Sequence, residues 1–166
     1  HDALLNKLKQ RRAAIPEAMT TYYRFINNIV DIMLSDKNEW VDITDKSPNA
    51  LKVSIRKINK EGEVTKKLME KVYVPDLTEE IRIYLGGGDD SVRVSNSQSK
   101  IKLRIVGGQG SKDYHIDTTI NNIKLYDIAN RASFSGQKEK LRTHLSNDSA
   151  NTAFVPVNLY NVWMPL

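Results

Sequence analysis

Two glycine-rich turns carry the residue types best suited to holding a cation. The candidate residues are Gly86, Gly88, Asp89 and Asp90 in the first turn and Gly108, Gly110 and Asp113 in the second. Glycine permits positive φ angles and close backbone approach, and carboxylate and carbonyl oxygens are the ligands that calcium prefers. The turns therefore have two interpretations, a structural turn and a weak calcium site.

The first turn matches a calcium-binding nonapeptide pattern better than the second does. The pattern is G-G-x-G-x-D-x-U-x, where U is a large apolar residue. The stretch from Leu85 to Arg93 keeps its second, fourth, sixth and eighth positions. In the stretch from Gly107 to His115, Lys112 stands where the ligand aspartate belongs. We therefore expect no cofactor and no metal, and keep calcium as the alternative.

No constellation of catalytic residues is visible in the sequence. The chain has no cysteine, and its three histidines are scattered without metal-ligand spacing. Adjacent carboxylates such as Asp89 and Asp90 would point to opposite faces of a strand. The glycines at 86–88 are not followed by the GK[ST] sequence or the helix that a phosphate-binding loop needs. We predict a chain that is not an enzyme and has no catalytic residues.

A basic surface is the second candidate site, formed by Arg82, Arg93, Lys100, Lys102 and Arg104. It could be a solvated sheet face that discourages edge pairing, or a stripe that binds anions. The chain has 25 Lys and Arg against 20 Asp and Glu, and only 7% aromatic residues. This mild charge, without interleaved aromatic residues, is not typical of a nucleic-acid binder, so we expect no nucleic-acid partner.

An internal repeat positions both candidate sites. Residues 81–94 align without gaps with residues 103–116, at an offset of 22. Each copy reads as an alternating strand, a glycine-rich turn and a second alternating strand. The repeats could be hairpins of a sandwich or successive coils of a short β-solenoid. In a solenoid, Arg82 and Arg104 would be neighbours outside the core.

The residues before the repeat predict a helix and then further strands. Apolar residues recur every three or four positions from Ile15 to Met33, and we expect this stripe to pack on the core. Pro16 predicts a kink or a helix pair. The alternating stretches 40–44 and 51–56 read as strands, and residues 63–71 as strand or loose helix.

The predicted fold class is α+β, with an N-terminal helix packed on a β-rich body that is solenoid-like or a sandwich. We divide the chain into a helical segment (1–34), a β-rich repeat domain (35–130) and a loop with an extended C-terminal segment (131–166). Residues 133–152 predict a loop, because they are polar, and residues 154–163 an edge strand interrupted by Pro156. The abrupt start and the apolar end predict a fragment of a larger protein, and no membrane-spanning segment or signal peptide is visible.

Several short motifs resemble a known region of large envelope proteins. They are Arg11, Arg12, Ile15, Pro16, Tyr22 and Tyr23 in the helix, the stretches 30–32 and 36–39, and above all the stretches 78–90 and 105–110. The sequence resembles the linking region of Bacteroidetes-type proteins in which a calcineurin-like metallophosphoesterase precedes a surface-antigen outer-membrane β-barrel. The resemblance covers about residues 8–127.

The resemblance implies a non-catalytic interdomain module of the cell envelope. The phosphoesterase motifs would lie upstream of this chain, and the apolar C-terminal tail would approach the barrel. The expected partners are the neighbouring domains of the same protein, including the membrane barrel. The expected location is the periplasm or outer membrane of a Gram-negative bacterium. Calcium-stabilised β-roll binding and polyanion binding remain the alternatives.

Overall fold

The computed structural model describes residues 2–46 and 48–154. These residues form one α-helix, eleven strands and two short 3-10 helices. The elements are α1 (Asp2–Asn28), β1 (Ile29–Met33), β2 (Glu39–Lys46), β3 (Ala50–Ile58), β4 (Val64–Tyr73), β5 (Glu80–Gly86), β6 (Asp90–Asn96), β7 (Lys102–Gly108), β8 (Lys112–Thr119), β9 (Ile123–Asp127), β10 (Ala132–Gly136), η1 (Lys138–Lys140), β11 (Leu141–Leu145) and η2 (Ser149–Thr152).

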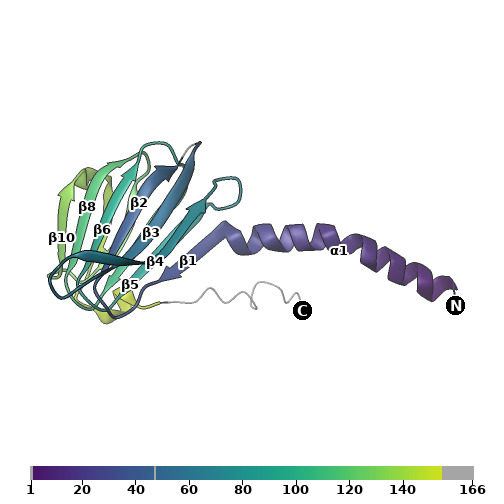
Figure 1. Ribbon diagram of the computed structural model, residues 1–166, viewed down its shortest axis with the longest axis horizontal. Coiled ribbons are helices and arrows are strands. Elements are labelled where there is room, and N and C mark those ends of the chain that lie inside the picture. Colours follow the sequence, from purple (N-terminus) through teal and green to yellow (C-terminus); the bar gives the residue numbers. More distant parts are fainter. Residues whose placement is uncertain (1, 47, 155–166) are drawn as a thin grey trace.

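The β body is a solenoid built from two facing sheets (Figure 1). The five strands of sheet A lie in the order β1-β5-β7-β9-β11 and are all parallel. Sheet B has the order β10-β8-β6-β2-β3-β4. From β5 onward, successive strands alternate between the sheets, so the chain winds from one to the other. The α+β fold class with a solenoid-like body is confirmed.

The internal repeat is the coil of this solenoid. Ile81 pairs with Leu103 and Arg82 with Arg104 in parallel register, which is the offset of 22 seen in the sequence. In sheet B, Val92 pairs with Tyr114 at the same offset. Stacked coils, and not the hairpins of a sandwich, therefore explain the repeat.

Alternate residues of each strand fill the space between the sheets. The core includes Ile81, Ile83, Leu85, Val92, Val94, Leu103, Ile105, Ile116, Ile123 and Leu125, all at most 3% exposed. This is the period-two burial expected for strands with one face on a core. Outward-facing residues at the intervening positions are consequently stacked in rows across the strands.

A long hairpin extends sheet B beyond the first coil. Strands β3 and β4 pair antiparallel with each other, and β3 pairs antiparallel with β2. One face of β3 contributes Leu51, Val53 and Ile55 to the core. Residues 63–71, for which the sequence predicts a strand or a loose helix, lie almost entirely in strand β4 at the edge of the sheet.

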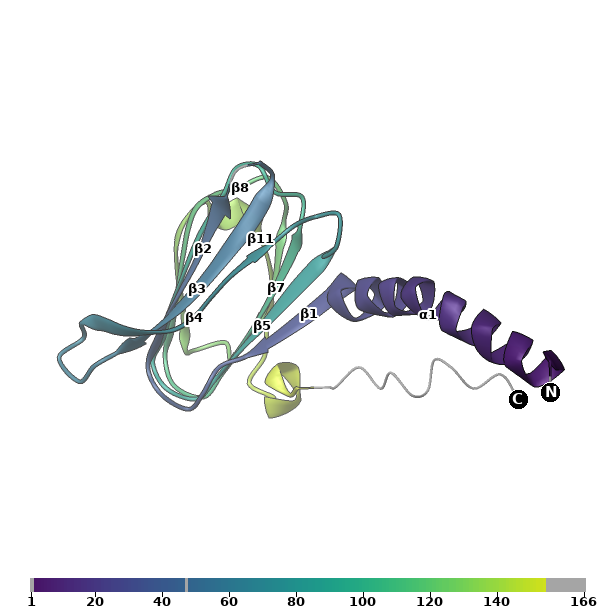
Figure 2. The same cartoon turned by 45° about the vertical axis from the view of Figure 1, so that its right-hand side comes forward.

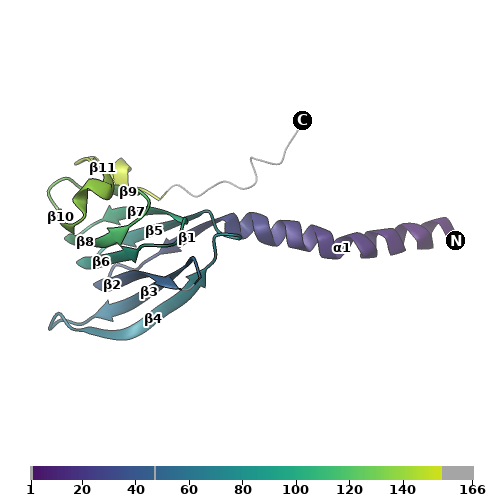
Figure 3. The ribbon, with the colours of Figure 1, turned by 90° about the horizontal axis from the view of Figure 1, so that it is seen from above.

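The helix α1 projects away from the β body (Figures 1 and 3). None of its residues is buried, and Met19 and Tyr22 are 59% and 58% exposed. The prediction that its apolar stripe packs on the core is therefore wrong. Pro16 lies inside a single helix, which changes direction near its middle (Figure 2). No helix among the described residues is long and apolar enough to cross a membrane.

Both ends of the β body differ from the sequence prediction. Residues 29–33, predicted as the end of the helix, form β1, because their backbone pairs with β5. Residues 133–152, predicted as a loop, contain most of β10 and all of β11, which pair with β8 and β9. Parallel neighbours supply hydrogen bonds to a polar segment that lacks strong strand propensity of its own. The predicted edge strand at 154–163 falls outside the described residues except for Phe154.

Candidate cation site and basic surface

The glycine-rich turns are shaped by the stacking of one coil on the next. Gly86, Gly88 and Gly110 have φ angles of 69°, 81° and 85°. A Cβ atom on Gly110 would lie 2.1 Å from the carbonyl oxygen of Gly88, and one on Gly108 would lie 2.0 Å from that of Gly86. The glycines are therefore required at these positions whether or not a metal binds.

Asp89 holds the next coil in register. Its Oδ1 accepts a hydrogen bond of 2.8 Å from the backbone N–H of Ser111, one coil further along. The N–H of Asp89 in turn donates to Oδ1 of Asn38 in the preceding coil, at 2.9 Å. Asp89 thus belongs to a ladder of side chains that bond the backbone of the following turn.

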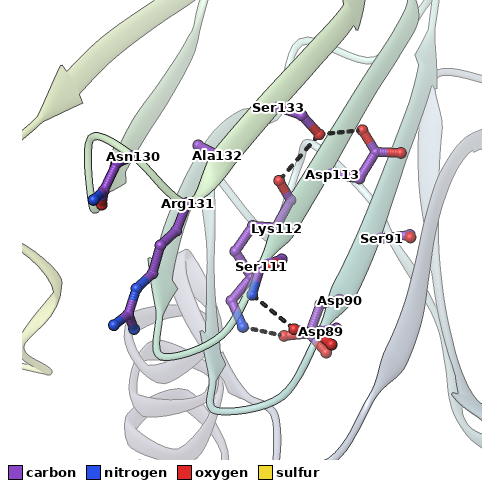
Figure 4. Close-up of a pocket in the computed structure, with 10 residues that line it drawn as sticks. All are labelled: Asp89, Asp90, Ser91, Ser111, Lys112, Asp113, Asn130, Arg131, Ala132 and Ser133. Atoms are coloured by element: carbon purple, nitrogen blue, oxygen red, sulfur yellow. Dashed lines mark hydrogen bonds and ion pairs between the residues drawn. The ribbon is translucent and has the colours of Figure 1, made fainter.

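The buried ammonium of Lys112 occupies the space between the two turns (Figure 4). Its Nζ donates to the carbonyl oxygens of Gly88 at 2.6 Å and Gln109 at 2.7 Å, and to Oδ2 of Asp90 at 2.7 Å. The carbonyl oxygen of Gly87 lies 3.4 Å away. Lys112 and Asp90 form an ion pair whose side chains are both fully buried. The oxygens that could have held a calcium ion thus surround an ammonium that belongs to the chain.

Asp90 shares its buried position with a second carboxylate. The backbone N–H of Glu39 donates to Asp90 Oδ1 at 2.9 Å, and Glu39 is 2% exposed. Burial raises the pKa of Asp90 to about 6, although the hydrogen bond from Lys112 acts in the opposite direction. Oε1 of Glu39 accepts a hydrogen bond from Ser35, whereas its Oε2 has no partner among the described residues.

Asp113 lies apart from the ammonium. It is exposed on the outer face of sheet B, where the Ser133 hydroxyl donates to its Oδ1 at 2.7 Å (Figure 4). Together with Asp89 and Arg131 it lines a shallow surface pocket. Among the residues with described placement, no group of three His, Cys, Asp or Glu side chains could hold a metal.

The predicted basic surface is divided between the two sheets. Arg82 and Arg104 are neighbours on sheet A, and their Nε atoms lie 3.2 Å and 2.9 Å from the same Glu80 oxygen. Lys102 lies on the same sheet and pairs with Glu79 at 2.7 Å.

Arg93 and Lys100 do not belong to that group. Arg93 lies on β6 in sheet B and pairs with Asp117 at 2.6 Å. Lys100 is exposed in the connection between β6 and β7. The five basic residues therefore do not form one stripe.

Two basic residues missed by the sequence analysis continue the Arg82 and Arg104 row. Lys124 on β9 pairs in register with Arg104, and Arg142 on β11 pairs with Lys124. The alternation in residues 123–127 could have indicated Lys124 as a further outward position. Nothing in the polar sequence around Arg142 identifies it as a strand residue.

Tyr114 and Asp127 form a buried polar pair that the sequence did not reveal. The Tyr114 hydroxyl donates to Oδ2 of Asp127 at 2.7 Å, and both residues are 0% exposed. Burial and the Asp127 charge raise the pKa of Tyr114 well above its ordinary value. Gly107 leaves room for the carboxylate, because a Cβ there would lie 2.0 Å from Asp127 Oδ1. The pair is enclosed, and we assign it to the packing of the last coils.

Comparison of the chain with protein-family models, with curated proteins and with solved structures finds no match.

Proposed function

We propose that this chain is a non-catalytic structural and interaction module of a larger cell-envelope protein, linking a phosphoesterase-like domain to a membrane barrel. The observation that carries the proposal is the exposed apolar face of α1. Leu4, Leu8, Ile15, Met19, Tyr22 and Ile26 fall on one side of the helix and are 42–64% exposed. A surface helix with such a face normally buries it against another surface. We assign that surface to a neighbouring domain.

The junction between α1 and the β body suits a module that sets the orientation of its neighbour. Asn28 ends the helix and Ile29 begins β1, so no linker residue separates the two elements. The N–H of Glu79 donates to the carbonyl oxygen of Asn28 at 2.8 Å, which ties the helix end to the second coil. A domain bound to α1 would therefore be held at a defined place relative to the solenoid.

The calcium-stabilised alternative has less support from the described turns. Lys112 already supplies a positive charge to the Asp90 carboxylate and the turn carbonyls. A calcium ion would have to displace a buried ammonium that makes several hydrogen bonds. We therefore propose that the glycine-rich turns have a structural role.

Photo-crosslinking in the intact parent protein tests the proposed role of α1. Benzoylphenylalanine at Met19 lies on the apolar face, and the same probe at Glu17 lies on the opposite face as the matched control. We expect position 19 to crosslink to a flanking domain of the same polypeptide and position 17 to give little product. A parent gene without flanking domains, or equal crosslinking at both positions, would refute the proposal.

A stability measurement separates an interaction face from a core face. Met19→Ala should leave the urea midpoint of the chain unchanged, because Met19 contacts no core. Ile105→Ala removes a side chain that is 0% exposed and should cost about 2–5 kcal/mol. An equal loss of stability in both variants would show that the apolar face of α1 packs within the folded core.

A further inference from the structure

Strand β1 leaves one edge of sheet A unpaired in the described part of the chain. It is the end strand of this sheet and pairs with β5 on one side only. Just beyond β1, the N–H of Leu34 donates to the carbonyl oxygen of Tyr84 on β5 at 2.8 Å. Backbone groups of successive residues point to opposite sides of a strand, so those of Ile32 also face β5, and those of Asp31 and Met33 face the open edge. Such unpaired groups are a template for a further strand.

Apolar side chains at this edge are also incompletely covered. Met33, on the outer face, is 60% exposed, and Val30 and Leu34 are only partly buried although they pack on the core. On β5, by contrast, Ile81 and Ile83 are 0% exposed. A strand added beside β1 would therefore bury apolar surface as well as pair backbone groups.

The described chain ends beside β5, the strand next to β1. After β11, the Asn151 side chain donates to the carbonyl oxygen of Asp127, the last residue of β9, at 3.0 Å. Phe154 then packs edge-on against Tyr84 of β5, with ring centroids 4.9 Å apart. The chain has thus crossed the outer face of sheet A from β9 over β7 to β5, and β1 is the next strand in that direction. Met33 is the register partner of Tyr84, so Phe154 lies level with the C-terminal end of β1.

The sequence that follows suits a strand at this edge. Residues 157–164 contain no proline and are rich in the β-branched and aromatic residues that favour strands. Pro156 and Pro165 lie on either side of this stretch, where a missing N–H removes no hydrogen bond between strands. A strand within residues 157–164 would therefore be free of proline along its whole length.

The length of this sequence also matches the open edge. β5 and a position beyond β1 are two strand spacings apart, about 10 Å, and about three extended residues span that distance. Residues 155–157 are therefore enough for the crossing. The next five residues, 158–162, equal β1 in length.

We propose that residues 158–162 pair with the open edge of β1 and form a sixth strand of sheet A. Because the chain arrives at the C-terminal end of β1, the added strand runs back along β1 and is antiparallel to it. Its backbone bonds the free N–H and C=O groups of Asp31 and Met33, and its side chains cover Met33 and Val30. The occupant is this chain's own C-terminal segment, because the described chain already ends beside β5 with this edge next in line. The inference uses no part of the apolar face of α1 and is independent of the proposed linking function.

Amide hydrogen exchange of the full chain, read by NMR, tests the pairing. In the wild type we expect the amides of Asp31 and Met33 to be protected along with that of Ile32, which faces β5. The double variant Tyr160→Pro/Asn161→Pro removes two successive N–H groups, one of which faces β1 whatever the register. It should accelerate exchange at Asp31 and Met33 at least about tenfold and leave exchange at Ile32 unchanged, because only the added strand is lost.

A matched variant separates the pairing from a general effect of proline. Met164→Pro/Leu166→Pro also introduces two prolines, but beyond the pairing segment, and should keep the exchange rates of the wild type. Fast exchange of Asp31 and Met33 in the wild type, or equal acceleration by both variants, would overturn the inference. Protection that survives in the first variant, or that is lost on dilution, would also overturn it, since another segment or a second copy would then cover the edge.

Discussion

Lys112 shows how one residue can change the chemistry of a turn. At the sequence level it only weakened the match to a calcium-binding pattern. In the structure its ammonium reaches back across one coil and bonds oxygens of both turns. A long flexible side chain can place its charge several ångströms from its backbone position, so spacing alone could not reveal this arrangement.

Replacing Lys112 by Met should strongly destabilise the chain. The variant leaves the Asp90 carboxylate and turn carbonyls buried without their donor, and loss of one member of a buried ion pair typically costs about 3–5 kcal/mol. Urea unfolding of the variant measures the cost. Lys102→Met is the control, because that lysine pairs with Glu79 at the surface and its loss should hardly change the midpoint. Equal midpoints for the two variants would show that the buried ammonium contributes nothing to stability.

Asp90 should make stability depend on pH in an unusual direction. Burial raises its pKa to about 6, above the ordinary 3.8. The folded chain therefore binds a proton more tightly than the unfolded chain does, and this group's contribution to stability falls as pH rises from about 4 to about 6. A difference of about two pKa units corresponds to about 3 kcal/mol.

Unfolding free energies of the wild type and Asp90→Asn at several pH values measure this effect. The advantage of the wild type over the variant should decrease between pH 4 and pH 6 and then become constant. An advantage that grows with pH over this range would mean that Lys112 holds the Asp90 pKa below its ordinary value.

At the scale of elements, the sequence predicts the repeat but not what surrounds helix α1. Every stacked coil needs the same residue types at the same positions. The alternation of apolar and polar residues and the offset of 22 residues therefore appear in the sequence, and strands β5 to β8 could be predicted from them. The apolar stripe of α1 predicts a buried face but does not say which surface covers it. The β body does not cover it, because no residue of α1 is buried. Strands β10 and β11 could not be predicted, because their extended conformation depends on pairing with β8 and β9.

The glycine turns give an element-scale prediction with an internal control. Gly110 and Gly62 have nearly the same φ angle, 85° and 82°. A Cβ on Gly110 would meet the Gly88 carbonyl oxygen at 2.1 Å, whereas a Cβ on Gly62 meets nothing within 4 Å. Gly62→Ala should therefore cost only the backbone strain, about 1–2 kcal/mol.

Gly110→Ala should cost clearly more, because it adds a clash between stacked coils, typically about 1–3 kcal/mol for an overpacked site. The urea midpoints of the two alanine variants give the comparison. Similar losses would mean that the coils can separate without cost at this turn.

At the scale of the whole molecule, each coil contacts mainly the coils next to it. Sheet A has β5 paired on both sides, by β1 and β7, whereas β11 pairs only with β9 in the part of the chain that is described. Residues 142–145 of β11 are all exposed. Repeat proteins of this kind lose structure from the ends, because a terminal unit has one stabilising interface instead of two.

Hydrogen exchange should therefore reveal a gradient along the solenoid. We expect backbone amides of β11 to exchange at least about tenfold faster than those of β5, since their local opening needs less free energy than global unfolding. Leu125→Ala, in β9, removes a fully buried side chain and should accelerate exchange in β9 and β11 more than in β5. Hydrogen exchange under native conditions, followed by mass spectrometry, measures both effects in one experiment. Uniform protection, with Leu125→Ala accelerating every strand equally, would show that the solenoid unfolds as a single cooperative unit despite its stacked architecture.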